Sequence, residues 1–421
     1  MILCIRWFSV LTLTLLIGLA SCDEVDELDD LSDPDASTDT DADTDTDTDT
    51  DTDVDTDTDV DPVIDLDCPA ASIADCGATD GMDLLRAELL PDLGGTVRFV
   101  DVAFNPDPES PFDVAVLANV EPDTANPFQV LVLFEMSEAA ESMDHPLTIA
   151  ELPSGGFDTA LGQSLAPGNT VGSSWHFLAT ICSGEGESFD EDSCALAGLR
   201  KDVEPELGFE VIYPYVLSSG LHGATVFGGG VWFYGSELTF TDWDWSLWST
   251  LFMADPGRDF RAIWSTGGDS SRVVVVGDNG TFRESDAPLV GPWDFVDAGT
   301  EADLVAVDEW SGITAAGGEA QTIVVKDGDE IQICPAGGET IEAVAWVDWE
   351  PPGAARLKVG TDTGSIIDVH TDAAQGATCL QTGFGSAILA LKVATVGAEK
   401  YLLVLTEDAL VWQMATWTEG D

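Results

Sequence analysis

The sequence predicts an all-β fold built from tandem units that each span roughly 40 residues. Short aliphatic runs alternate along the chain with turn signals, and 41 Gly and 20 Pro are spread through it. Helical periodicity is weak, and a small residue inside an aliphatic motif recurs at nearly regular intervals. A unit of this length with about four short strands is typical of one blade of a β-propeller, whose apolar faces only neighbouring blades can cover.

The repeat is defined by an alanine inside each aliphatic start motif, and successive motifs after the second are 38 to 45 residues apart. Seven starts predict seven blades. The first interval is 76 residues, which leaves six to eight blades open. Two β-sandwich domains are the alternative architecture, because they also use short strands and turns. The motifs lie at Ala103, Ala179, Ala224, Ala262, Ala306, Ala345 and Ala390.

Four hairpins are expected in the second half of the chain. Asn279-Gly280 is a strong hairpin turn between two aliphatic runs. The only modest helix candidate is Asp83–Leu90. The expected hairpins span Val273–Phe282, Thr322–Ile331, Arg356–Ile367 and Leu402–Trp412.

The N-terminus carries an export signal. Arg6 precedes the apolar run Trp7–Leu19, which is shorter than the about 20 apolar residues that a membrane span needs. The run ends in Leu19-Ala20-Ser21-Cys22, which resembles the lipobox of bacterial lipoproteins. The resemblance implies cleavage before Cys22, acylation of its thiol, and anchoring of an extracytoplasmic protein to a membrane of the cell envelope through lipid. It leaves open which membrane leaflet holds the anchor.

An acidic segment follows Cys22. Asp23–Asp67 contains 22 acidic and no basic residues, and Asp occupies every odd position from 39 to 61. Such a segment has no apolar face to bury and repels itself, so we expect a disordered, extended tether. It lacks the Gly that EF-hand-like loops need for their sharp turn. We therefore expect no cofactor and no defined metal site, only loose association of divalent cations with the tether.

The formal net charge of −65 restricts the partners. Nucleic-acid affinity depends on Lys and Arg that neutralise phosphates, so this chain should not bind nucleic acid. An anionic membrane surface should also repel it, which leaves lipid at Cys22 as the membrane attachment. The acidity indicates solubility, with an acidic docking surface for a cationic partner as the alternative.

Six cysteines remain after the signal sequence and Cys22 are set aside. An even number in an exported chain predicts disulfides, although six cysteines permit 15 pairings. Proximity favours Cys68 with Cys76 and Cys182 with Cys194, and Cys334 with Cys379 then follows by elimination. Zinc is disfavoured because the chain has no C-x-x-C pair.

The unit Phe260–Asp286 resembles the Asp-box, or BNR-like, propeller repeats of bacterial exported proteins. Ser285-Asp286 are followed by Gly291 and Trp293, which is a partial match to the box. The resemblance implies a propeller fold, in which the box is a structural turn and not a catalytic site.

No catalytic motif stands out. The chain lacks a G-x-S-x-G elbow, a P-loop, an H-E-x-x-H pair and a Rossmann fingerprint. The best recognition feature lies in Thr241–Trp248, where strand alternation would put Trp243 and Trp245 on one face and Asp242 and Asp244 on the other. These residues could stack on sugars or grip a cation, or the tryptophans could pack between blades.

The sequence therefore predicts four segments: a signal peptide (1–21), a lipidated Cys with its tether (22–67), a disulfide-containing lead-in (68–96) and a β-propeller (97–421). We expect a cell-envelope lipoprotein whose non-catalytic propeller binds a protein or a glycan or serves as an envelope scaffold. The alternative is an extracytoplasmic enzyme of the glycosidase or lyase type with its site at the propeller channel. Fold alone does not decide between them.

Overall fold

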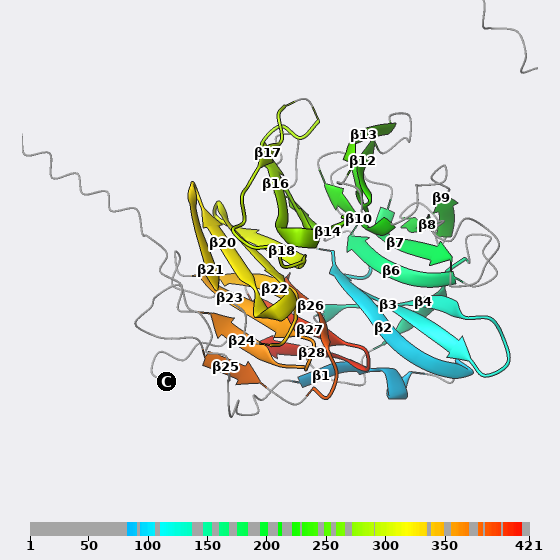
Figure 1. The fold of residues 1–421 in the computed structure, drawn as a ribbon. Coiled ribbons are helices and arrows are strands. Elements are labelled where there is room, and N and C mark those ends of the chain that lie inside the picture. The colour runs from blue at the N-terminus through cyan, green and yellow to red at the C-terminus, as the bar shows by residue number, and fades with distance from the viewer. Residues whose placement is uncertain are drawn as a thin grey trace, which may run out of the picture. The chain divides into compact units, whose positions relative to one another are not determined.

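Seven four-stranded antiparallel sheets make up the computed structural model (Figure 1). All of the described residues belong to one unit, Asp61–Asp421. The structure describes residues 82–90, 93–105, 110–136, 146–153, 160–167, 175–183, 194–200, 209–212, 221–227, 230–242, 248–253, 258–265, 272–289, 291–334, 338–348, 355–369, 378–381, 384–396 and 399–414.

Each of the first three blades is a four-stranded meander in which strands adjacent in sequence pair with one another. The first blade contains β2 (Gly95–Phe104), β3 (Val114–Pro122), β4 (Phe128–Phe134) and β5 (Thr148–Glu151). The second contains β6 (Ala160–Pro167), β7 (Trp175–Ser183), β8 (Cys194–Arg200) and β9 (Phe209–Ile212). The third contains β10 (Leu221–Phe227), β11 (Gly230–Gly235), β12 (Glu237–Asp242) and β13 (Trp248–Met253).

The fourth to sixth blades repeat this order. The fourth contains β14 (Phe260–Ser265), β15 (Val273–Gly277), β16 (Thr281–Ser285) and β17 (Asp294–Phe295). The fifth contains β18 (Leu304–Trp310), β19 (Ile313–Gly318), β20 (Ile323–Asp327) and β21 (Glu330–Cys334). The sixth contains β22 (Ile341–Asp348), β23 (Ala355–Thr361), β24 (Ile366–Val369) and β25 (Thr378–Gln381).

The seventh blade combines the two ends of the propeller. Its strands β26 (Ile388–Val396), β27 (Glu399–Thr406) and β28 (Ala409–Met414) come from the C-terminal part, and its outermost strand is β1 (Met82–Arg86). The first strand of each blade contacts the first strand of the next, and β26 contacts β2, so the ring is closed. The chain therefore forms a seven-bladed β-propeller, as the repeat predicts.

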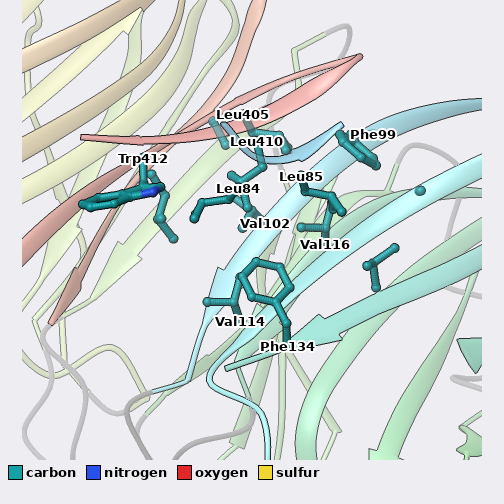
Figure 2. Packing of buried hydrophobic residues seen from close by; sticks show 14 of the residues in the cluster. Leu84, Leu85, Phe99, Val102, Val114, Val116, Phe134, Leu405, Leu410 and Trp412 are labelled. Carbon is teal, nitrogen blue, oxygen red and sulfur yellow. The ribbon is translucent and has the colours of Figure 1, made fainter. Parts of the chain in front are cut away.

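The hydrophobic core lies between the blades, because each sheet is apolar on both faces. The largest cluster joins the seventh and first blades and includes Leu84, Leu85, Phe99, Val116 and Trp412 (Figure 2). Further clusters of buried aliphatic side chains fill the other blade-to-blade contacts. This burial explains why the strands read as continuous aliphatic runs and not as alternating ones.

All four expected hairpins are present, as β15–β16, β20–β21, β23–β24 and β27–β28. Three details differ from expectation. The helix expected at Asp83–Leu90 is strand β1 followed by the short 3-10 helix η1 (Ala87–Leu89). Strand β1 also belongs to the propeller, although the segment 68–96 was expected to precede it. Ala179 lies in β7, the second strand of its blade, and the wide first interval hides no eighth sheet among the described residues.

The other short helices are η2 (Asp278–Gly280) and η3 (Glu319–Gln321), which are turns between the second and third strands of their blades. Among the described residues, no helix is both long and apolar enough to span a membrane.

Candidate binding site at one end of the ring

The first strand of every blade carries a register irregularity. In each case one residue is skipped by the pairing with the second strand. Bulges of this kind redirect a side chain and are common beside functional sites. The skipped residues are Val100, Gln163, His222, Arg261, Val305, Glu342 and Leu389.

Two ends of the ring can be distinguished from the strand directions. Neighbouring strands of a blade are antiparallel, so the start of the first strand lies at the same end as the turn between the second and third strands. We call this the leading end. His222 and Arg261 lie near it, because they follow the starts of β10 and β14.

His222 and Asp259 are joined across two blades. The Nε2 atom of His222 lies 2.9 Å from Oδ2 of Asp259, which directly precedes β14. The N–H of Asp259 donates to Oδ2 of Asp278 at 3.0 Å, and the N–H of Asp278 donates to the carbonyl of Asp259 at 2.9 Å. The turn η2 is thereby fixed to the start of the same blade.

Arg261 binds Asp278 with two hydrogen bonds, from Nε to Oδ1 at 2.6 Å and from Nη2 to Oδ2 at 3.3 Å. Bidentate Arg–carboxylate pairs fix geometry as well as charge. Partial burial alone would raise the pKa of Asp278. The hydrogen bonds from Arg261 and Asp259 and the charge of Arg261 outweigh burial, so the pKa of this carboxyl lies below its usual value.

Asp303 connects the fourth blade to the fifth. Its Oδ1 accepts from the N–H of Asn279 at 2.7 Å, and its carbonyl accepts from the N–H of Glu319 at 2.9 Å.

The turn that Asp303 holds has positive backbone angles, since Asn279 has a φ of 54° and Gly280 a φ of 67°. A Cβ on Gly280 would lie 1.9 Å from the carbonyl oxygen of Thr300, so the turn requires glycine there.

These five residues, His222, Asp259, Arg261, Asp278 and Asp303, form what we call the rim cluster. The side chains of His222, Asp259 and Arg261 are 29%, 30% and 34% exposed, so solvent and a partner can reach them. The cluster contains three carboxylates against one guanidinium and one imidazole. It is therefore a fixed, partly exposed and mainly anionic surface.

A second group of charges lies on the first strands of the first, fifth and seventh blades, with Asp101 in β2, Asp308 in β18 and Lys392 in β26. Oδ2 of Asp101 accepts from the N–H of Leu165 at 2.8 Å, and Oδ2 of Asp308 accepts from the N–H of Trp346 at 2.7 Å. Each bond links one blade to the next. Burial raises the pKa of both carboxyls, that of Asp308 to about 6, and the charge of Lys392 opposes the rise in both.

The site residues expected from the sequence are only partly described. Trp243, Trp245 and Asp244 lie outside the described residues, as do Cys22, Cys68 and Cys76. Asp242 ends β12 and pairs with Gly230. The structure contains the disulfide between Cys182 and Cys194, which joins β7 to β8.

The remaining two cysteines lie on the outer strands of neighbouring blades. Cys334 ends β21 and is disulfide-bonded, and Cys379 lies in β25. Among the described residues, no group of three or more His, Cys, Asp or Glu side chains is arranged to hold a metal ion.

The segment Ser285–Trp293, which partly matches the box in sequence, is a turn held by its own hydrogen bonds. The Ser285 hydroxyl donates to the carbonyl of Pro292 at 2.7 Å and accepts from the N–H of Ala287, while Nε1 of Trp293 donates to the carbonyl of Pro288 at 3.1 Å.

The sequence patterns do not predict the rim cluster. Its one visible signal is the acidic residue that recurs at the turn between second and third strands, at Asp278, Glu319, Asp362 and Glu407.

Comparison with known proteins identifies the fold alone. No family model matches the chain, and no curated protein matches it. A structure of the Mitotic Checkpoint Complex aligns with a TM-score of 0.54 at 10% identity, covering 82% of this chain and 98% of that chain. A structure of BBS1N in complex with ARL6DN aligns with a TM-score of 0.52 at 11% identity over 81% and 99%. YCF48 bound to D1 peptide aligns with a TM-score of 0.49 at 10% identity over 82% and 99%.

Proposed function

We propose that this protein is a lipid-anchored cell-envelope protein whose non-catalytic propeller binds a protein partner at its leading end. Cys22 carries the lipid, and the acidic tether holds the propeller away from the membrane surface. Two acyl signals are needed for stable anchoring, which acylation of both the thiol and the new amino end would provide.

The rim cluster is the observation that carries the binding proposal. Its carboxylates are held by backbone hydrogen bonds and by Arg261, so a partner meets a surface that needs little ordering on binding. A protein partner is favoured over a glycan because two structures that align with TM-scores above 0.5 are of protein complexes.

A non-catalytic role is supported by how the described arginines are used. Arg261, Arg272 and Arg356 bind three different carboxylates, those of Asp278, Glu284 and Asp368. The guanidinium of Arg283 lies 5.5 Å from the centre of the Phe295 ring. They do not converge on one point, as a site that grips an acidic sugar would require.

The binding proposal is tested with the full chain, purified in detergent and immobilised. Proteins captured from envelope extracts of the source cells are quantified for the wild type and for the double variant Asp259→Asn/Asp303→Asn, which removes two rim charges at nearly constant shape. The matched control is Asp329→Asn/Glu330→Gln, which removes two exposed charges from the turn between β20 and β21, at the opposite end of the ring.

We expect one or more proteins to be depleted from the rim variant and retained by the control. Equal capture by all three forms would contradict the proposal. Hydrolysis of envelope polysaccharide that is lost in Asp278→Asn would contradict its non-catalytic part.

The anchor is tested separately by mass spectrometry of the mature protein. We expect the N-terminal residue to be diacylated or triacylated Cys22, and we expect Cys22→Ser to move the protein from the membrane to the soluble fraction. An unmodified mature N-terminus would contradict lipid anchoring without affecting the binding proposal.

A further inference from the structure

The outer edge of the fourth blade differs from those of the other six. Its outermost strand, β17, contains two residues, whereas the outermost strands of the other blades contain four to six. In Figure 1 β16 and β17 lie at the periphery of the ring, as the outer strands of the fourth blade. A short edge strand covers little of the strand behind it, so polar backbone groups remain available there.

Two large apolar side chains are exposed at this edge. Phe295 of β17 is 63% exposed, and Leu289 in the connection from β16 is 44% exposed. Among the described residues the only other large exposed apolar side chain is Leu89, in η1. The guanidinium of Arg283 lies 5.5 Å from the centre of the Phe295 ring, which holds the ring in place.

The backbone of Phe295 faces away from the blade. Phe295 is directly opposite Arg283, and the next residue, Val296, donates its N–H to the carbonyl of Phe282 at 3.0 Å. Alternate residues of a strand direct their N–H and C=O groups to opposite sides. Phe295 therefore directs both groups outward, where an additional strand would pair.

The surroundings of this edge are acidic. Four exposed acidic residues lie within six positions of Phe295 or Leu289 in the sequence: Asp286, Asp294, Asp297 and Glu301. Exposed charges on an edge strand oppose pairing with a like-charged strand. The chain has a formal net charge of −65, so a second copy of it is disfavoured as the occupant and a basic segment is favoured.

We propose that the outer edge of the fourth blade is a second interaction surface, which binds an extended basic segment of another protein as an added strand. The N–H and C=O of Phe295 pair with the segment, an apolar side chain of the segment packs on Phe295 and Leu289, and basic side chains face the four carboxylates. Strand addition of this kind takes affinity from backbone hydrogen bonds and specificity from side chains. This inference rests on the proposed function, because it assumes that the protein has a protein partner. The surface it concerns is separate from the rim cluster.

The test uses the full chain in detergent and a fluorescently labelled synthetic peptide of alternating Lys and Val. Binding is followed by fluorescence anisotropy at low salt. Phe295→Pro removes the outward N–H and the ring, and proline is tolerated where an edge N–H faces solvent. Phe295→Ala removes the ring and keeps the N–H. Leu89→Ala is the matched control, since it removes an equally exposed apolar side chain from another blade.

We expect the Lys/Val peptide to bind the wild type and Leu89→Ala equally. Phe295→Ala should weaken binding about fivefold and Phe295→Pro more than about tenfold, a loss of at least 1.4 kcal/mol. A peptide in which Glu replaces Lys should bind at least about tenfold more weakly, and added salt should weaken binding of the Lys peptide.

Equal binding by wild type and Phe295→Pro, with unchanged thermal melting of the variant, would overturn the proposal. Equal binding of the Lys and Glu peptides would also overturn it, because the charge argument would then fail. The rim variant Asp259→Asn/Asp303→Asn should bind the peptide as the wild type does. If the capture experiment finds no partner for the rim cluster, the peptide experiment still tests the edge of the fourth blade on its own.

Discussion

Met82 and Trp412 are directly opposite one another in the outermost strand pair of the seventh blade, although they lie at the two ends of the described chain. The pairing of β1 with β28 closes the ring. Residues at this contact should therefore control the stability of the whole propeller.

Leu84→Ala should destabilise the protein by about 2–5 kcal/mol, because Leu84 is buried between β1 and the first blade (Figure 2). Leu89→Ala should change the free energy of unfolding by about 0.5 kcal/mol or less, because Leu89 is exposed. Urea unfolding followed by tryptophan fluorescence measures both. Similar effects of the two substitutions would contradict closure by β1.

Removal of the Cys182–Cys194 disulfide should lower stability by about 2–3 kcal/mol, as expected for a short closed loop. The double variant Cys182→Ala/Cys194→Ala and the wild type are compared by denaturant unfolding without reductant. A double variant as stable as the wild type would show that this bond does not restrain the unfolded chain.

Gly280→Ala should cost about 2–3 kcal/mol, because the residue has a positive φ and a Cβ would collide with the carbonyl of Thr300. Gly312→Ala is the matched control, since Gly312 also has a positive φ but open space around it. Its cost should be about 1 kcal/mol. Equal costs in thermal melts would mean that the packing of η2 on the next blade is not tight.

Asp308→Asn should stabilise the protein at neutral pH by about 1–2 kcal/mol. Burial raises the pKa of Asp308 to about 6, so the folded state holds this proton more tightly than the unfolded state does. Ionisation of the Asp308 carboxyl therefore lowers the free energy of unfolding as pH rises from about 4 to about 6. The asparagine side chain of the variant does not ionise, so its stability does not fall for this reason.

Unfolding of wild type and Asp308→Asn across this pH range measures the difference. It should grow as pH rises to about 6 and stay constant above it. Lys392→Met should increase the loss in the wild-type background, because the charge of Lys392 favours the ionised carboxyl. A pH-independent difference would contradict the environment assigned to Asp308.

The fold was predictable from the sequence largely because its repeats are local. Asn279-Gly280 and Gly364 mark turns whose positive φ values the structure contains, and the aliphatic runs beside them pair as expected. The position of β1 was not predictable, since its partner β28 is distant in the sequence and nothing within Met82–Arg86 distinguishes it from a short helix. The motif at Ala179 predicts the first strand of a blade but lies in the second, because β6 and β7 carry similar small and aliphatic residues.

The rim cluster was not predictable for a different reason. A skipped residue at His222 or Arg261 depends on the register between two strands, and sequence patterns do not fix register at that level. The sequence shows the acidic Asp278 at the η2 turn. Its ion pair with Arg261 could not be predicted, because Arg261 is the residue skipped in the pairing of β14 with β15. The amino-acid composition predicts an anionic surface, but it does not predict where on that surface the rim cluster lies.

The rigidity of the rim cluster is the central claim, and amide hydrogen exchange tests it without a known partner. The N–H groups of Asp278, Asn279, Gly280 and Glu319 lie in turns, yet each donates to Asp259, Asp303 or Ala302. We expect these four amides to exchange as slowly as those of the neighbouring strands β15 and β19, and Asp303→Ala to speed exchange at Asn279. Exchange of all four at the rate of an open loop would contradict a preformed binding surface.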